Sequence, residues 1–236
     1  MPNWELKSCT SPSAVAQQCA AECLAFIAQS NTRACIAVSG GRIAKDFFTA
    51  LARLTHEQGR SLAHVHFFWA DERCVPPDDA ESNYRSAAEL LIVPLGLPAQ
   101  NVHRLRGEDD PDRAAQAAEA ELRRWTAASS GSQPVLDLVL LGMGEDGHVA
   151  SLFPGEPAEV MGSDAVYRPV TASKPPPRRI TLGYGAIAAA REVWVLASGA
   201  GKEAALRESL SPSGKTPLAR VLQRRTLTRI FTDLAW

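Results

Sequence analysis

The sequence lacks an excess of charge of either sign, a long apolar run and a secretion signal. Its 25 Lys and Arg residues are balanced by 26 Asp and Glu residues. A dedicated nucleic-acid surface would need an excess of Lys and Arg on one face. No apolar run reaches the ~18 residues of a membrane span, and no basic-then-apolar pattern opens the chain. We therefore expect a soluble, cytoplasmic protein that binds neither nucleic acid nor a membrane.

The sequence also lacks a disulfide or metal framework, although it contains five cysteines. Their odd number and irregular spacing favour reduced thiols. Cys19 and Cys23 lie one helical turn apart, but no second Cys/His pair at ligand spacing follows them. We expect buried thiols and no metal site. A chain of 236 residues can bury a core without either kind of crosslink.

Short apolar runs alternate with helical patterns along the whole chain. The runs predict strands at 34–38, 65–69, 136–141, 166–170, 180–182, 193–197 and 228–231. Helical patterns cover 11–29, 43–54, 83–92, 112–128 and 202–210, with Ser11 and Asp110 as caps. Continuous apolar strands that alternate with helices predict an α/β fold. We expect residues 1–236 to form a single domain, with a mostly parallel, Rossmann-like sheet and helices on both faces.

Three polar clusters follow predicted strands: 39–42, a charged turn at 71–73, and 142–148. Ligands bind at the carboxyl ends of strands in such folds, so we expect the clusters to form one site. The glycines of 142–148 allow a tight turn that brings backbone N–H groups close to a ligand. His148 precedes a predicted short helix at 149–153, whose N-terminus would tend to lower the histidine pKa and keep it a base. Alone, this loop also fits an ordinary glycine-rich turn with an exposed histidine.

The segment 140–154, Leu-Leu-Gly-Met-Gly-Glu-Asp-Gly-His-Val-Ala-Ser-Leu-Phe-Pro, resembles the signature of the 6-phosphogluconolactonases, which belong to a wider group with glucosamine-6-phosphate deaminases. The resemblance continues at 68–76, at Asp79, Ser82 and Asn83, at 175–182 and at 199–202, and spans residues 34 to about 206. It implies hydrolysis of 6-phospho-D-glucono-1,5-lactone to 6-phosphogluconate, a step of the oxidative pentose phosphate pathway, without a cofactor. We expect a monomer whose partner is this small phosphorylated sugar lactone.

Residue by residue, the resemblance implies a base, a substrate-positioning acid and a phosphate pocket. His148 would activate water, and Asp71 would position the sugar or support the histidine. The pocket and its loop would comprise Arg73, Arg179 and Lys202 as phosphate ligands, Gly40, Gly41 and Arg42 as lining, and Gly142, Gly144, Asp146 and Gly147 in the histidine loop. Arginine forks and a Gly-Gly turn before a helix suit a phosphate. In isolation, however, Arg73 also fits a surface ion pair and Lys202 a solvated lysine.

The chain departs from the family pattern in one place. The family usually shows Ser-Gly-Gly-Ser/Arg-Thr-Pro after the first strand, whereas this chain has Arg42-Ile43-Ala44 after the two glycines. The change removes a hydroxyl and a pre-set helix start.

Lactone hydrolysis requires a base for water, donors for the oxyanion and an anchor for the substrate. The sequence has no Gly-x-Ser-x-Gly nucleophile elbow at a strand end, which leaves general-base catalysis by His148. One alternative is a glucosamine-6-phosphate deaminase/isomerase, which typically has Asp-Glu-Tyr at 71–73 and an Ala-Phe-Asn-Glu-Pro-like run after the histidine. Here Arg73 and the Ser-Leu-Phe-Pro run at 151–154 favour the lactonase. The other alternative, a non-catalytic sugar-phosphate-binding module, would usually carry a DNA-binding domain, for which the chain has no basic helix.

Overall fold

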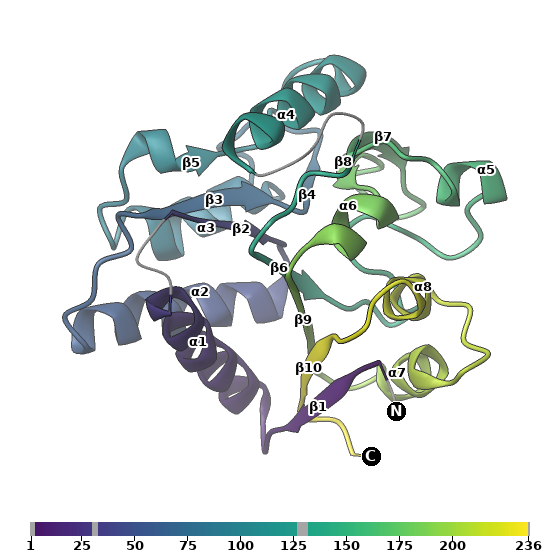
Figure 1. The fold of residues 1–236 in the computed structure, drawn as a ribbon, viewed down its shortest axis with the longest axis horizontal. Helices are drawn as coiled ribbons and strands as arrows, with labels where there is room; N and C mark the ends of the chain where they lie inside the picture. The colour runs from purple at the N-terminus through teal and green to yellow at the C-terminus, as the bar shows by residue number, and fades with distance from the viewer. Residues whose placement is uncertain (1–2, 30–32, 127–131, 236) are drawn as a thin grey trace.

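A seven-stranded sheet forms the centre of the computed structural model, which describes residues 3–29, 33–126 and 132–235 (Figure 1). All its strands are parallel, in the order β1 (Glu5–Ser8), β10 (Arg229–Thr232), β9 (Glu192–Ala197), β6 (Leu138–Gly142), β2 (Ala34–Val38), β3 (Val65–Trp69) and β5 (Val102–His103). Every residue of β2 and β3 is buried, as expected for central strands covered on both faces. The predicted mostly parallel sheet is confirmed.

Helices cover both faces of this sheet. The helices of the described residues are α1 (Pro12–Ala28), α2 (Arg42–Glu57), α3 (Asn83–Ala87), α4 (Pro111–Trp125), α5 (Ala158–Met161), α6 (Tyr184–Ala189), α7 (Glu203–Leu210) and α8 (Pro217–Gln223), with a π-helical turn at Ala88–Ile92 and a 3-10 turn at Ala99–Asn101. In Figure 1, α1 and α2 pack on one side, and α6 and α8 lie on the other. Ser11 and Asp110 cap α1 and α4 as predicted, and residues 127–128 of the predicted fourth helix lie outside the described residues. In the described part of the chain, no helix has both the length and the apolarity to cross a membrane.

A second, antiparallel sheet corrects the prediction of a charged turn at 71–73. This segment is β4 (Asp71–Arg73), which pairs with β8 (Arg178–Leu182), and β8 pairs with β7 (Tyr167–Thr171). Side chains alternate between the two faces of a strand, so β4 sends its first and third residues to one face and Glu72 to the other. The register places Arg73 opposite Arg179 and so brings together two residues that are distant in the sequence.

The predicted helix at 149–153 is also wrong. Val149 forms isolated bridges with Met143 and Leu152, and Ala150 adopts a positive φ of 49°. Ser151 is held by tertiary bonds, because its N–H donates to Thr181 Oγ1 (3.2 Å) and its hydroxyl to Asp71 Oδ2 (2.7 Å). The segment directly after His148 is therefore a turn, and no helix N-terminus lies beside this histidine.

Candidate active site

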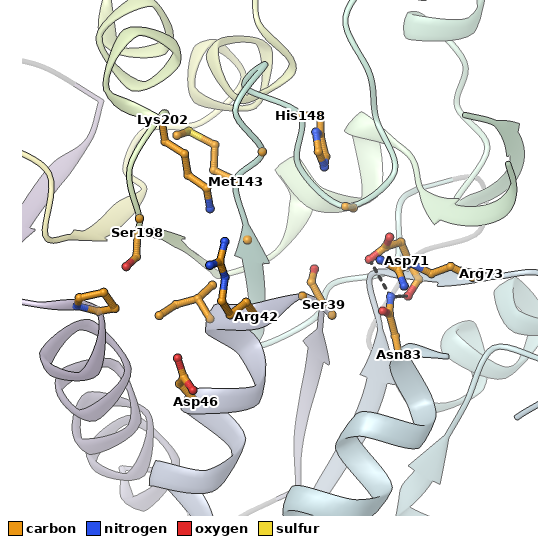
Figure 2. Close-up of a pocket in the computed structure, with 18 of the residues that line it drawn as sticks. Ser39, Arg42, Asp46, Asp71, Arg73, Asn83, Met143, His148, Ser198 and Lys202 are labelled. Atoms are coloured by element: carbon orange, nitrogen blue, oxygen red, sulfur yellow. Dashed lines mark hydrogen bonds between the residues drawn. The ribbon is translucent and has the colours of Figure 1, made fainter. Parts of the chain in front are cut away.

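The carboxyl ends of the central strands meet over a pocket of about 230 Å³ (Figure 2). It is lined by ten of the residues predicted from the sequence: Gly40, Gly41, Arg42, Asp71, Arg73, Gly142, Gly144, His148, Arg179 and Lys202. Residues of all three predicted polar clusters therefore line one pocket. Asp146 and Gly147 belong to the histidine loop behind this lining. Within the described residues, no three His, Cys, Asp or Glu side chains are grouped to hold a metal ion.

Asp146 orients His148 in the pocket. The Nδ1 atom of His148 lies 2.5 Å from Asp146 Oδ1, and the His148 backbone N–H donates to the same oxygen at 3.2 Å. Burial opposes ionisation of Asp146, but the hydrogen bonds and charge of His148 prevail and hold its pKa below the ordinary value. A carboxylate on Nδ1 fixes the tautomer in which Nε2 has a free lone pair. The partner of the histidine is therefore the acid two residues before it.

Asp71 is hydrogen-bonded to the segment after His148 and to the start of α3. It is only 4% exposed, accepts a hydrogen bond from the Ser151 hydroxyl, and its backbone carbonyl accepts one from Asn83 Nδ2 at 2.9 Å. Of the two roles predicted for Asp71, this arrangement favours positioning the substrate.

Glycines of the histidine loop leave room for the side chains around them. A Cβ atom built on Gly144 would lie 2.1 Å from the His148 ring and 2.8 Å from Asp146 Oδ1. One built on Gly147, whose φ is +75°, would lie 2.6 Å from Thr216 Cβ. Larger residues at either position would displace the loop that holds His148.

Gly144→Ala therefore tests how far activity depends on the placement of the His148 ring. We expect the variant to fold and to lose about 10- to 100-fold in kcat, since a shift of the order of an ångström in a catalytic group has such an effect. Gly142→Ala is the control, because its Cβ would meet only the Gly40 carbonyl, at an ordinary 3.7 Å. Steady-state kinetics should show the smaller loss for Gly142→Ala, and equal kcat values for the two variants would contradict the argument.

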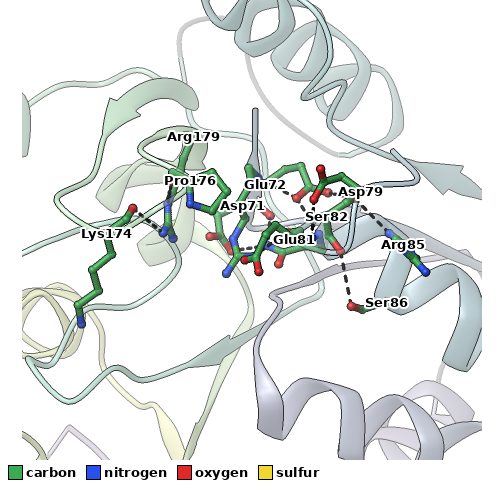
Figure 3. A network of polar contacts seen from close by, with 12 residues as sticks. Asp71, Glu72, Asp79, Glu81, Ser82, Arg85, Ser86, Lys174, Pro176 and Arg179 are labelled. Carbon is green, nitrogen blue, oxygen red and sulfur yellow. Dashed lines mark hydrogen bonds and ion pairs between the residues drawn. The ribbon is translucent and has the colours of Figure 1, made fainter. Parts of the chain in front are cut away.

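Glu72 lies on the face of β4 opposite to Asp71 and Arg73 and holds β4 in place through hydrogen bonds (Figure 3). Its Oε1 accepts from the backbone N–H groups of Arg73 (2.7 Å) and Asn83 (2.8 Å). Its Oε2 accepts from the N–H of Tyr84 (2.7 Å) and the hydroxyl of Ser82 (3.1 Å). Burial raises the pKa of this carboxyl, against the lowering effect of the N–H donors. Glu72 thus joins β4 to the start of α3 and holds the flanking residues of the pocket in place.

Four cations line the pocket, in two pairs. Arg73 and Arg179 form one pair, because they lie opposite each other on β4 and β8. Arg179 is 6% exposed, and its Nε donates a hydrogen bond to the Pro176 carbonyl at 3.0 Å. Burial, and then the charge of Arg73, lower the pKa of Arg179. Arg73 Nη1 donates to the Glu81 carbonyl at 2.6 Å, while its buried Nε has no partner.

Arg42 and Lys202 form the second pair, on the other side of His148 from Arg73 (Figure 2). Burial, and then the charge of Arg42, lower the pKa of Lys202. Among the described residues, neither side chain has an acidic partner within ion-pair distance. Arg42 is exposed and Lys202 is half-buried, and two neighbouring cations without an acidic partner can accommodate an anion.

Several lining residues were not predicted as ligands: Ser39, Ile43, Asp46, Asn83, Met143 and Ser198. Ser39 and Ser198 follow directly after β2 and β9, so their position at a strand end was the signal available in the sequence. Both hydroxyls are buried without a hydrogen-bond partner.

Comparisons with known proteins show the family to which this chain belongs. The model of the family described as glucosamine-6-phosphate isomerases/6-phosphogluconolactonase matches residues 10–231. The 6-phosphogluconolactonase of Mycobacterium tuberculosis is 40% identical over 196 residues, which cover 79% of each chain, and that of Synechocystis is 38% identical over 178 residues, covering 75% of this chain and 71% of the relative. The crystal structure of 6-phosphogluconolactonase from Thermotoga maritima superposes with a TM-score of 0.80 at 28% identity, over 98% of this chain and 99% of the other. A monomeric glucosamine-6-phosphate deaminase, at 18% identity and a TM-score of 0.80, shares the fold. The chain belongs to the glucosamine-6-phosphate isomerase/6-phosphogluconolactonase family.

Proposed function

We propose that this protein hydrolyses 6-phospho-D-glucono-1,5-lactone to 6-phosphogluconate, with His148 as general base and no cofactor. The observation that carries the proposal is the position of His148, oriented by Asp146, between two pairs of cations in one pocket. An enzyme for this lactone needs a base, an anion seat and donors for a developing oxyanion. The relatives named 6-phosphogluconolactonase support the same substrate.

We infer that the two cation pairs have different tasks, which refines the expectation that Arg73, Arg179 and Lys202 all hold the phosphate. Arg42 and Lys202 lie beside the Gly40-Gly41 turn at the start of α2, where backbone N–H groups and the helix dipole favour an anion. This end suits the phosphate. Arg73 and Arg179 are beside Asp71 and suit the lactone end.

The reaction then needs one proton acceptor. His148 Nε2 takes a proton from water as the water oxygen attacks the C1 carbonyl, and the arginine pair stabilises the oxyanion of the tetrahedral intermediate. When the intermediate collapses, the C1–O5 bond breaks and the O5 leaving group receives the proton from His148. Asp71 binds hydroxyls of the substrate. The product is the open-chain acid.

The proposed function is tested by following acid release from 6-phosphogluconolactone and subtracting the spontaneous hydrolysis. We expect the wild-type protein to accelerate release strongly and to form no ammonia from glucosamine 6-phosphate. Ammonia formation without lactone hydrolysis would identify the deaminase instead. Binding of both sugar phosphates without turnover of either would identify a non-catalytic binding module.

We further propose that the enzyme works as a monomer in the cytoplasm. All five cysteines are free, which is compatible with a reducing compartment. Size-exclusion chromatography coupled to light scattering would test the oligomeric state.

A further inference from the structure

We propose that the hydroxyl of Ser198 is a phosphate ligand that determines affinity for the phosphorylated substrate. This inference rests on the proposed function and adds to it a neutral donor beside the two cations. Ser198 is 6% exposed, lines the pocket, and has no hydrogen-bond partner for its Oγ. Burying a hydroxyl without a partner costs free energy, and a bound ligand that accepts its hydrogen removes that cost.

The position of Ser198 identifies the ligand group. Ser198 is the first residue after β9, and a short loop with positive φ at Gly199 (97°) and Gly201 (87°) leads from it to Lys202. In Figure 2, Ser198 lies at the same end of the pocket as Lys202 and Arg42, away from Asp71 and Arg73. Arg42 and Lys202 are the cations at this end, where the Asp46 carboxylate also lies below Arg42, and a phosphate oxygen is the acceptor that the two cations attract.

The other residues that line this end of the pocket increase the importance of the Ser198 hydroxyl. Ile43, which directly follows Arg42 in the first turn of α2, lines the same pocket, and its side chain has no polar atom. The other lining hydroxyl, Ser39, lies between Arg42 and Asp71, nearer the middle of the pocket (Figure 2). A serine hydroxyl rotates among three staggered positions, so Ser198 can turn towards a bound anion without a change in the backbone.

Ser198→Ala tests the proposal by calorimetric titration with 6-phosphogluconate and by kinetics on the lactone. We expect Kd and KM to rise roughly 10- to 100-fold, with kcat nearly unchanged, because an anchor remote from the reacting carbon contributes uniform binding. Thr228→Val is the control, since the Thr228 hydroxyl is also buried without a partner but does not line the pocket. It should leave Kd and KM unchanged, and a wild-type Kd and KM for Ser198→Ala would overturn the proposal.

A second pair of variants separates the hydroxyl from packing. In the Ser198→Ala background, Ile43→Thr and Ile43→Val introduce side chains of the same shape, and only threonine has a hydroxyl. We expect threonine, and not valine, to restore part of the affinity for 6-phosphogluconate. Equal Kd values for the two double variants would show that a hydroxyl at this end is not used and would refute the proposal.

These measurements also distinguish this inference from the proposed function. A wild-type protein that hydrolyses the lactone, with Ser198→Ala unchanged in Kd and KM, refutes only the role of Ser198. A wild-type protein that binds 6-phosphogluconate without hydrolysing the lactone refutes the function, while the Kd series still decides the role of Ser198. If the wild-type protein does neither, both proposals are wrong.

Discussion

Replacing His148 with alanine should abolish most catalysis while leaving the protein folded and able to bind 6-phosphogluconate. His148 is the group in the pocket whose ring is oriented by a carboxylate and whose other nitrogen is free to accept a proton. A positioned general base contributes about 10²- to 10⁴-fold to the rate, so kcat should fall by that factor. KM should change little, because the proposed phosphate ligands are untouched. Initial rates of acid release, corrected for spontaneous hydrolysis, measure the effect.

His56→Ala is the matched control for this variant. His56 is an exposed histidine of α2 whose Nε2 contacts the Pro94 carbonyl at 3.1 Å, outside the pocket. It should keep the wild-type kcat. If His148→Ala also keeps it while remaining folded, another group must activate the water, and the mechanism is wrong even if the lactone is the substrate.

The strands that are buried on both faces could be predicted from the sequence. β2 and β3 were recognisable because a parallel strand covered on both faces must be apolar at every position. β4 has only three residues, all charged, and it is a strand because β8, about a hundred residues later, pairs with it. Such a tertiary pairing leaves no periodic signal within three residues. The short β1 and β5, at opposite edges of the sheet, were not predicted either.

The residues of the site were predictable from motifs, but their contacts were not. The pocket contains the predicted histidine and cations, yet the acid that holds His148 is Asp146, and Asp71 hydrogen-bonds to Ser151. The hydrogen bonds of Ser151 to β4 and β8 also explain why the segment after His148 turns instead of forming a helix. Contacts between distant segments decided the partners of Asp71 and Ser151, and one sequence does not contain such contacts. The contact of Asp146 with His148 is local, but the motif alone does not show which acid holds the histidine.

Glu72→Gln should lower the free energy of unfolding more than the other substitutions proposed for this protein, although it keeps the shape of the side chain. Each of the two Glu72 carboxylate oxygens accepts two hydrogen bonds. A glutamine side chain has only one acceptor oxygen, because an NH2 group replaces the other. Its NH2 group would face two donors in a site that is 2% exposed, which leaves those donors unsatisfied. We expect a loss of roughly 2–4 kcal/mol in the free energy of unfolding, since each unsatisfied buried donor costs about 1–3 kcal/mol.

For a chain of this size that loss should lower the Tm by roughly 5–15 °C, measured by differential scanning calorimetry. Glu57→Gln is the control, because Glu57 forms an exposed i,i+4 pair with Arg53 and such pairs contribute less than about 1 kcal/mol. A Glu72→Gln protein as stable as Glu57→Gln would show that Glu72 does not anchor α3 to β4. Because Asp71 and Arg73 flank Glu72 on β4, the loss of this anchor should also raise KM for the lactone, at temperatures where the variant is still folded.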